Sequence, residues 1–67
     1  MKAAVITKST EYYISIKECL INTQGISNLI EDASNNKIIF EFTTHNAVEG
    51  LREKLITFGT AIEFVFL

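Results

Sequence analysis

The sequence has no proline and only one cysteine, and each shortage excludes something. Because neither proline nor a tract rich in serine and glycine interrupts the 67 residues, no linker divides them. We therefore expect a single domain over residues 1–67. The lone Cys19 cannot form an intrachain disulfide, so nothing in the chain requires an oxidising compartment.

Long apolar runs are missing too. No run approaches the roughly 20 apolar residues of a transmembrane helix. The apolar start of the chain reaches only to Ile6 before Thr7, Lys8 and Ser9 interrupt it, which is too short for a signal peptide. We therefore expect a cytoplasmic protein with no membrane partner.

Positive charge is scarce as well. Six Lys and Arg residues are scattered among eight Asp and Glu residues, which gives a formal net charge of −2. A nucleic-acid partner would require a basic patch, so we expect none. The hydrophobic content of 48% is enough to build one core. Stability should be modest, because a chain this short buries only about 60% of the surface that its unfolded form exposes.

The apolar residues that are present follow the order strand, helix, strand, strand, helix, strand. The predicted strands are residues 3–7, 26–32, 37–43 and 60–67, and the predicted helices are residues 10–24 and 46–58. This order is typical of a split β-α-β sandwich, in which two helices cover one face of a four-stranded antiparallel sheet. We therefore predict an α+β, ferredoxin-like βαββαβ fold with strand order 4-1-3-2.

Both helices have recognisable ends and one apolar stripe. Ser9 or Thr10 can accept hydrogen bonds at the first helix start, and Gly25 suits the left-handed residue after its end. Asn46 and Glu49 resemble a capping box at the second helix start. The stripes are Tyr13, Ile16 and Leu20 in the first helix and Val48, Leu51, Leu55 and Phe58 in the second.

The last two strands carry more apolar residues than one sheet face requires. Side chains alternate between the faces of a strand, so each strand divides into two sets. These sets are Ile38, Phe40 and Phe42 against Ile39, Glu41 and Thr43, and Ile62, Phe64 and Phe66 against Ala61, Glu63, Val65 and Leu67. Ile39, Val65 and Leu67, joined by Ile6 or Val5, would leave apolar surface on the face without helices. The alternative is that these are the scattered apolar residues that any small protein exposes.

The fourth strand should also be a sheet edge without a charged residue at its end, and such an edge favours pairing with another strand. We therefore predict an interface at Ile39, Ala61, Glu63, Val65 and Leu67, and a homodimer through the C-terminal strand.

The chain resembles the heavy-metal-associated domain, a small copper-chaperone-like module with this order of elements. Ile16, Cys19 and Leu20 fall at its apolar helix positions. Gly25-Ile26 looks like its Gly-Val, and Leu51, Leu55 and Phe58-Gly59 resemble its second helix and terminal Leu-Gly. The resemblance covers most of the chain and implies the same fold.

The metal motif of that family, Met-x-Cys-x-x-Cys, is absent. Its cysteines would fall at Ser9 and Tyr12, Thr7 stands in place of its methionine, and Thr60 stands where an aromatic residue or lysine usually lies. Soft copper(I) and zinc ions are held by thiolates, which a hydroxyl and a phenol cannot replace at neutral pH. We therefore expect no metal, no cofactor and no metal transport. The same scaffold occurs in ligand-sensing ACT domains and in chaperones that bind twin-arginine signal peptides.

The candidate chemical groups have simpler readings. Cys19 reads as a small core residue and His45 as a solvated loop residue. The carboxylate pairs at residues 31–32 and 49–53 most simply keep the domain soluble. No nucleophile and base come from adjacent motifs, so we expect no enzyme. An acylphosphatase-type enzyme would need an arginine after the first strand, whereas the only arginine is Arg52.

The loop of Lys8, Ser9 and Thr10 combines a cation, two hydroxyls and the N–H groups of a helix start. It could receive an anion or a peptide carboxylate, or it could be an ordinary helix cap.

The sequence therefore favours a non-enzymatic module that binds a protein or peptide through the sheet edge and the open face. The alternatives are a ligand-sensing regulatory domain, in which two copies form a pocket near Ser9 and Thr60, and a signal-peptide-binding chaperone.

Overall fold

The computed structural model describes residues 1–67, except for the side chain of Thr60, so predictions about that side chain lie outside the described residues. The strands are β1 (Lys2–Thr7), β2 (Ile26–Asp32), β3 (Lys37–Phe42) and β4 (Ile62–Phe66), and the helices are α1 (Tyr13–Ile21) and α2 (His45–Leu55). Short 3-10 helices precede α1 (η1, Thr10–Tyr12), join β2 to β3 (η2, Ala33–Asn35) and follow α2 (η3, Ile56–Ala61).

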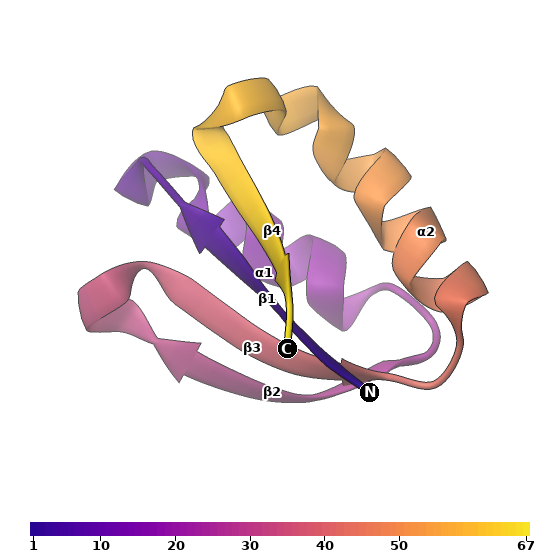
Figure 1. Ribbon diagram of the computed structural model, residues 1–67. Helices are drawn as coiled ribbons and strands as arrows, with labels where there is room; N and C mark the ends of the chain where they lie inside the picture. The colour runs from indigo at the N-terminus through magenta and orange to yellow at the C-terminus, as the bar shows by residue number, and fades with distance from the viewer.

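The four strands form one antiparallel sheet in the order β2-β3-β1-β4. Read from the other edge, this is the predicted order 4-1-3-2, and the ferredoxin-like α+β fold is confirmed. Both helices cover the same face of the sheet, and the two termini lie close together (Figure 1). We call the face away from the helices the open face.

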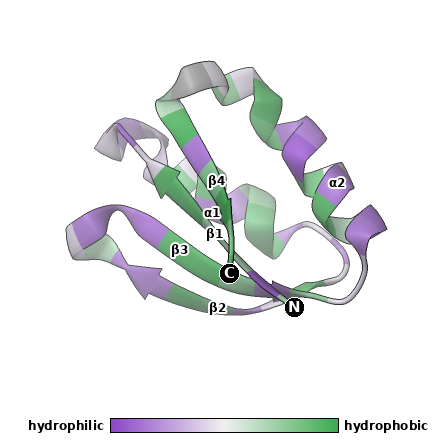
Figure 2. Ribbon diagram, viewed as in Figure 1, coloured by the Kyte–Doolittle hydropathy of each residue, from purple (hydrophilic) through white to green (hydrophobic). Residues whose placement is uncertain are grey.

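The core lies between the sheet and the helices. Its buried members are Ala3, Val5, Ile16, Leu20, Ile38, Phe40, Phe42, Val48, Leu51 and Leu55. Hydrophobic stretches follow β1, β3 and β4, whereas α2 alternates between hydrophobic and hydrophilic residues along its length (Figure 2). The predicted helix stripes are confirmed at their centres, while Tyr13 and Phe58 are only partly buried. Cys19 packs against the core, as expected.

The start of α2 differs from the prediction. Thr44 is the N-cap, with extended backbone angles, and its hydroxyl accepts from the Ala47 backbone N–H at 3.2 Å. Asn46 lies inside the first turn, so the predicted capping box of Asn46 with Glu49 is wrong. His45 is the first helical residue and not a loop residue. The helix begins earlier than predicted because the Thr44 hydroxyl accepts a hydrogen bond from the first turn, and threonine is a favoured N-cap residue.

Both helices end earlier than predicted. α1 ends at Ile21 and α2 at Leu55, and the chain tightens into η3 after α2. Gly25 and Gly59 have the positive φ angles expected of them, 89° and 59°. Neither directly follows its helix as predicted, because Gly25 lies in the loop before β2 and Gly59 lies within η3. β4 begins at Ile62, which leaves Ala61 in η3 instead of the strand.

β2 is interrupted by a bulge. The register with β3 shifts between Ser27 and Ile30, and Asn28 has a φ angle of 51° there. The turn to β3 contains Asn36 at φ 52°, as expected for an asparagine turn.

Candidate functional site

The open face carries one apolar row that crosses all four strands, which we call the central row. Its members are Ile30 in β2, Ile39 in β3, Ala4 in β1 and Val65 in β4. Ile39 is the register partner of both Ile30 and Ala4, and Ala4 is also the partner of Val65. Ile30 is 57% exposed, Ile39 and Val65 are partly exposed, and Ala4 is covered by its neighbours. The row is therefore a continuous apolar strip without a helix over it.

Charged residues flank the central row on both sides. On one side, Asp32 pairs in register with Lys37, which pairs with Ile6, which pairs with Glu63. On the other side, Ser27 pairs with Glu41, and Glu41 pairs with Lys2. An apolar centre with a charged rim is the usual anatomy of a protein interface.

The structure places four of the five predicted interface residues on or beside this face. Ile39 and Val65 belong to the central row, and Glu63 belongs to its rim. Leu67 follows β4, and its backbone N–H donates to the Lys2 carbonyl at 3.0 Å. Ala61 lies before the strand, in η3.

The structure also decides which of Val5 and Ile6 lies on the open face. Val5 is buried in the core and Ile6 lies on the open face. Neither Ile30 nor Ala4 was predicted for the interface, because their alignment with Ile39 depends on the bulge and on strand register.

β4 is an edge strand that pairs with β1 alone among the described residues. At its two ends, the Lys8 N–H donates to the Ala61 carbonyl at 2.7 Å and the Leu67 N–H donates to the Lys2 carbonyl. In an antiparallel ladder, hydrogen-bonded pairs alternate with non-hydrogen-bonded pairs. The backbone groups of Glu63 and Val65 therefore face β1, and those of Ile62, Phe64 and Phe66 point outward.

The opposite edge is less suited to pairing. β2 contains the bulge at Asn28, whose side-chain amide donates to Glu41, and bulges disrupt an edge as a template for another strand. β4 has no such bulge, so it is the more receptive edge of the sheet.

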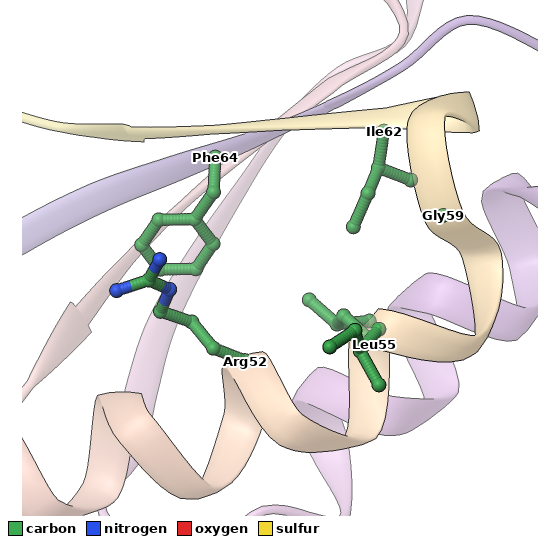
Figure 3. Close-up of a pocket in the computed structure, with 6 residues that line it drawn as sticks. Arg52, Leu55, Gly59, Ile62 and Phe64 are labelled. Carbon is green, nitrogen blue, oxygen red and sulfur yellow. The ribbon is translucent and has the colours of Figure 1, made fainter.

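A small hollow of about 180 Å³ lies between α2 and β4, and we call it the β4 pocket. Its walls are Leu55 and Ile56 of the helical side, Ile62 and Phe64 of β4, and Gly59, with Arg52 at one end. Figure 3 shows Ile62 and Phe64 pointing from β4 toward α2. The Arg52 guanidinium carbon lies 5.7 Å from the centre of the Phe64 ring, a cation–π distance.

The loop before α1 is tied down by local hydrogen bonds. The buried Thr7 hydroxyl donates to the Ser9 carbonyl at 2.7 Å, and the Ser9 hydroxyl accepts from the Glu11 N–H at 3.4 Å. Lys8 is joined to Ala61 through its backbone, while Lys8 and Thr10 are exposed. These contacts are those of a helix cap. The prediction that the loop receives an anion or a peptide stays a prediction.

Ser9 and Tyr12, where the resemblance predicted metal-binding cysteines to fall, make contacts of their own. Ser9 caps η1, and the Tyr12 ring packs edge-on against Phe58 with 5.4 Å between ring centres. Within the described part of the chain, no three His, Cys, Asp or Glu side chains gather as a metal site.

The carboxylates Glu31 and Asp32 do not form a pair, because they lie on opposite faces of β2. The Tyr13 hydroxyl donates to Glu31 at 2.8 Å, and Lys17 lies 3.1 Å from it. Both contacts lower the pKa of Glu31. Asp32 accepts from Asn35 and Ser34, each at 2.9 Å, and these bonds lower its pKa.

The pKa of Tyr13 shifts in the opposite direction. Burial, followed by the hydrogen bond to Glu31, raises the pKa of Tyr13 to about 12. This cluster joins α1 to β2 through the Tyr13–Glu31 hydrogen bond and the Lys17–Glu31 ion pair. We therefore assign this cluster a structural role.

The chain matches no family model and no curated protein in sequence. Among solved structures, the uncharacterized protein TM1266 from Thermotoga maritima is similar in fold. The two proteins are 17% identical with a TM-score of 0.57, and the similarity covers 94% of this chain and 85% of that one. At this identity the likeness supports the fold alone. In addition, no helix in the described residues is long and apolar enough to cross a membrane.

Proposed function

We propose that this protein is a non-enzymatic interaction module that binds a protein or peptide through its open face and β4 edge. The observation that carries the proposal is the central row, in which Ile30, Ile39, Ala4 and Val65 align across the whole sheet. The exposed surface of the row comes from Ile30, Ile39 and Val65, and the buried Ala4 joins them. Aligned apolar side chains exclude water from a partner more effectively than scattered ones. The charged rim would then set the partner's orientation.

The proposal includes a metal-free relation to the heavy-metal-associated domain and a cytoplasmic location. Ser9 and Tyr12 supply no thiolate, and the capping and aromatic contacts give both residues a structural role. Titration of the reduced protein with zinc or copper(I) tests this part, with Cys19→Ala as the companion variant. Tight stoichiometric binding by both proteins would contradict it.

Affinity capture from the native cell, with Ile39→Lys beside the wild type, tests the open face. A lysine at the centre of the central row should abolish capture of the true partner, because its charge would lose water on binding. The matched control is Ile14→Lys, which changes an exposed isoleucine on α1. A partner captured equally by all three proteins, each folded by circular dichroism, would refute the open face as the binding surface.

A ligand-sensing domain is the second candidate. It is favoured by a hollow of about 310 Å³ between the start of α1 and the β2–β3 turn, lined by Thr10, Tyr13, Ile14, Ala33 and Asn36. This volume lies at the lower end of ligand pockets. A thermal-shift screen of amino acids, nucleotides and phosphates separates the candidates, since a ligand of the native state raises the melting temperature. No shift at millimolar ligand would count against the sensor.

A further inference from the structure

We propose that β4 pairs with β4 of a second copy in one defined register, centred on Phe64, and that Phe66 of each copy enters the β4 pocket of the other. This inference rests on the proposed function and names the occupant of the edge. The N–H and C=O groups of Ile62, Phe64 and Phe66 all point away from β1 and need partners from outside the chain or from water.

Side-chain chemistry selects the register. Only registers that place outward residues opposite outward residues can form hydrogen bonds, and these are centred on residues 62 to 66. A register centred on Glu63 would set two carboxylates directly opposite each other, which is destabilising. One centred on Val65 would leave the outward groups of Ile62 without a partner in β4. With Phe64 at the centre, the outward groups of all three residues are paired, and Glu63 lies opposite Val65 of the second copy.

The same register places the exposed Phe66 side chain next to the open β4 pocket. Phe66 lies on the helix side of β4, 5.2 Å from the Phe64 ring between centres, and is 51% exposed. Antiparallel pairing centred on Phe64 sets Phe66 of one copy directly opposite Ile62 of the other. Ile62 forms a wall of the β4 pocket, where Figure 3 shows the space between β4 and α2. Directly opposite residues have Cβ atoms about 5 Å apart, so the ring reaches the pocket.

The neighbouring surface fits the same arrangement. Ile56 lines the pocket and is 76% exposed, and the second copy's Phe66 would cover it. Two-fold symmetry repeats each contact, so both Phe66 rings are covered and both β4 pockets are filled. Each pocket is therefore completed by a residue of the other copy. A foreign peptide could form the same backbone hydrogen bonds. However, it would have to supply an aromatic residue opposite Ile62, which this chain already supplies as Phe66.

Sedimentation velocity of the full reduced chain, from about 1 µM to 1 mM, tests the pairing. We expect the wild type to reach twice the mass of one chain. Ile56→Lys changes only an exposed helix residue and should raise the dimer dissociation constant by about tenfold or more. Ile21→Lys is the matched control, because Ile21 is an isoleucine 60% exposed on α1, away from β4. Its dissociation constant should equal that of the wild type. Phe66→Lys should weaken the dimer as Ile56→Lys does.

Disulfide trapping tests the register in a Cys19→Ser background. Glu63→Cys and Val65→Cys proteins, mixed and oxidised with oxidised glutathione, should form a cross-linked heterodimer, because opposed residues of a non-hydrogen-bonded pair lie about 4.5 Å apart between Cα atoms. Each variant alone should cross-link much less, since its two copies of the same residue lie on the diagonal, about 7–8 Å apart.

The outcomes separate this inference from the function on which it rests. A wild type that stays monomeric to 1 mM overturns the pairing and leaves the open-face proposal to the capture experiment. A dimer that Ile56→Lys and Phe66→Lys leave intact, but that Ile39→Lys dissociates, overturns the edge in favour of the open face. Efficient cross-linking of Glu63→Cys by itself overturns the register.

Discussion

Gly25 meets two requirements that any other residue would meet only with strain. Its φ angle of 89° lies in a region that side chains rarely adopt, and a Cβ atom there would lie 2.8 Å from the Ala47 Cβ and 3.3 Å from the Thr43 hydroxyl oxygen. The glycine therefore allows the loop between α1 and β2 to lie directly against the start of α2. The Thr43 backbone N–H also donates to the Gly25 carbonyl at 3.2 Å, which holds the two segments together.

Gly25→Ala should lower the free energy of unfolding by at least about 1–2 kcal/mol, from the backbone angle alone. Urea denaturation followed by circular dichroism measures it. The control is Gly50→Ala, which makes the same chemical change in the middle of α2, where a Cβ would meet nothing within 4 Å. That variant should gain about 0.5–1 kcal/mol from the better helix propensity of alanine. Equal shifts in the two variants would contradict the role given to Gly25.

Tyr13 predicts an alkaline pH dependence of stability. Its pKa is 10.0 as a free side chain and about 12 in the folded protein, so the folded state holds the proton more tightly. The contribution is complete below pH 10 and is lost as the pH rises toward 12. Absorbance titration should show one tyrosine ionising near pH 12. Unfolding free energies at pH 9 and pH 11.5 should differ more for the wild type than for Tyr13→Phe, and an equal difference would exclude this cause.

Glu31 predicts a pH dependence of stability at acidic pH, through its contacts with Tyr13 and Lys17. The Tyr13 hydroxyl and Lys17 lower its folded pKa, so its contribution is present above the unfolded pKa and is lost as the pH falls through the folded value. Because Glu31 is exposed to solvent, the effect should be small. Comparing Glu31→Gln with the wild type between pH 6 and pH 3 measures it, and parallel curves would show that the carboxylate contributes nothing.

Among the elements, α2 depends on a cap that lies two residues before the one its sequence suggests. Thr44→Ala should lower the free energy of unfolding by about 0.5–2 kcal/mol, because the Ala47 N–H then loses its acceptor. Asn46→Ala is the control, since Asn46 sits in the first turn and caps nothing. It should change stability by less than about 0.5 kcal/mol. A larger loss for Asn46→Ala than for Thr44→Ala would restore Asn46 as the cap.

The two edge elements of the sheet differ in what they can accept. β2 is bulged at Asn28 and tied to α1 through Glu31, whereas β4 runs without a bulge and presents the backbone of Ile62, Phe64 and Phe66. The difference concentrates any strand pairing at one side of the molecule. That side also carries the β4 pocket, so backbone and side-chain recognition coincide there.

For the whole molecule, the proposed pairing of two copies would make stability depend on protein concentration. If copies pair in the native state alone, the melting temperature must rise with protein concentration. We expect a rise of a few degrees between 5 µM and 500 µM for the wild type, and a flat dependence for Ile56→Lys. Differential scanning calorimetry at the two concentrations measures both. A wild-type melting temperature independent of concentration would contradict self-association.

Much of this molecule was determined by local pattern in the sequence. The order of elements, the two helix stripes and the alternating faces of β3 and β4 all follow from periodicities that neighbouring residues share. The same patterns predicted that Ile39 and Val65 face away from the helices. They also placed Gly25 and Gly59 after the helices, because glycine adopts positive φ at little cost.

Only the tertiary structure decided which of these side chains meet. Strand register and the bulge at Asn28 bring Ile30, Ile39, Ala4 and Val65 into one row, and the pairing of β1 sends Val5 inward and Ile6 outward. The packing of α2 beside β4 makes the β4 pocket. Register comes from hydrogen bonds between strands that are distant in the sequence, and a slip of one residue reverses every face, so no local pattern can contain it.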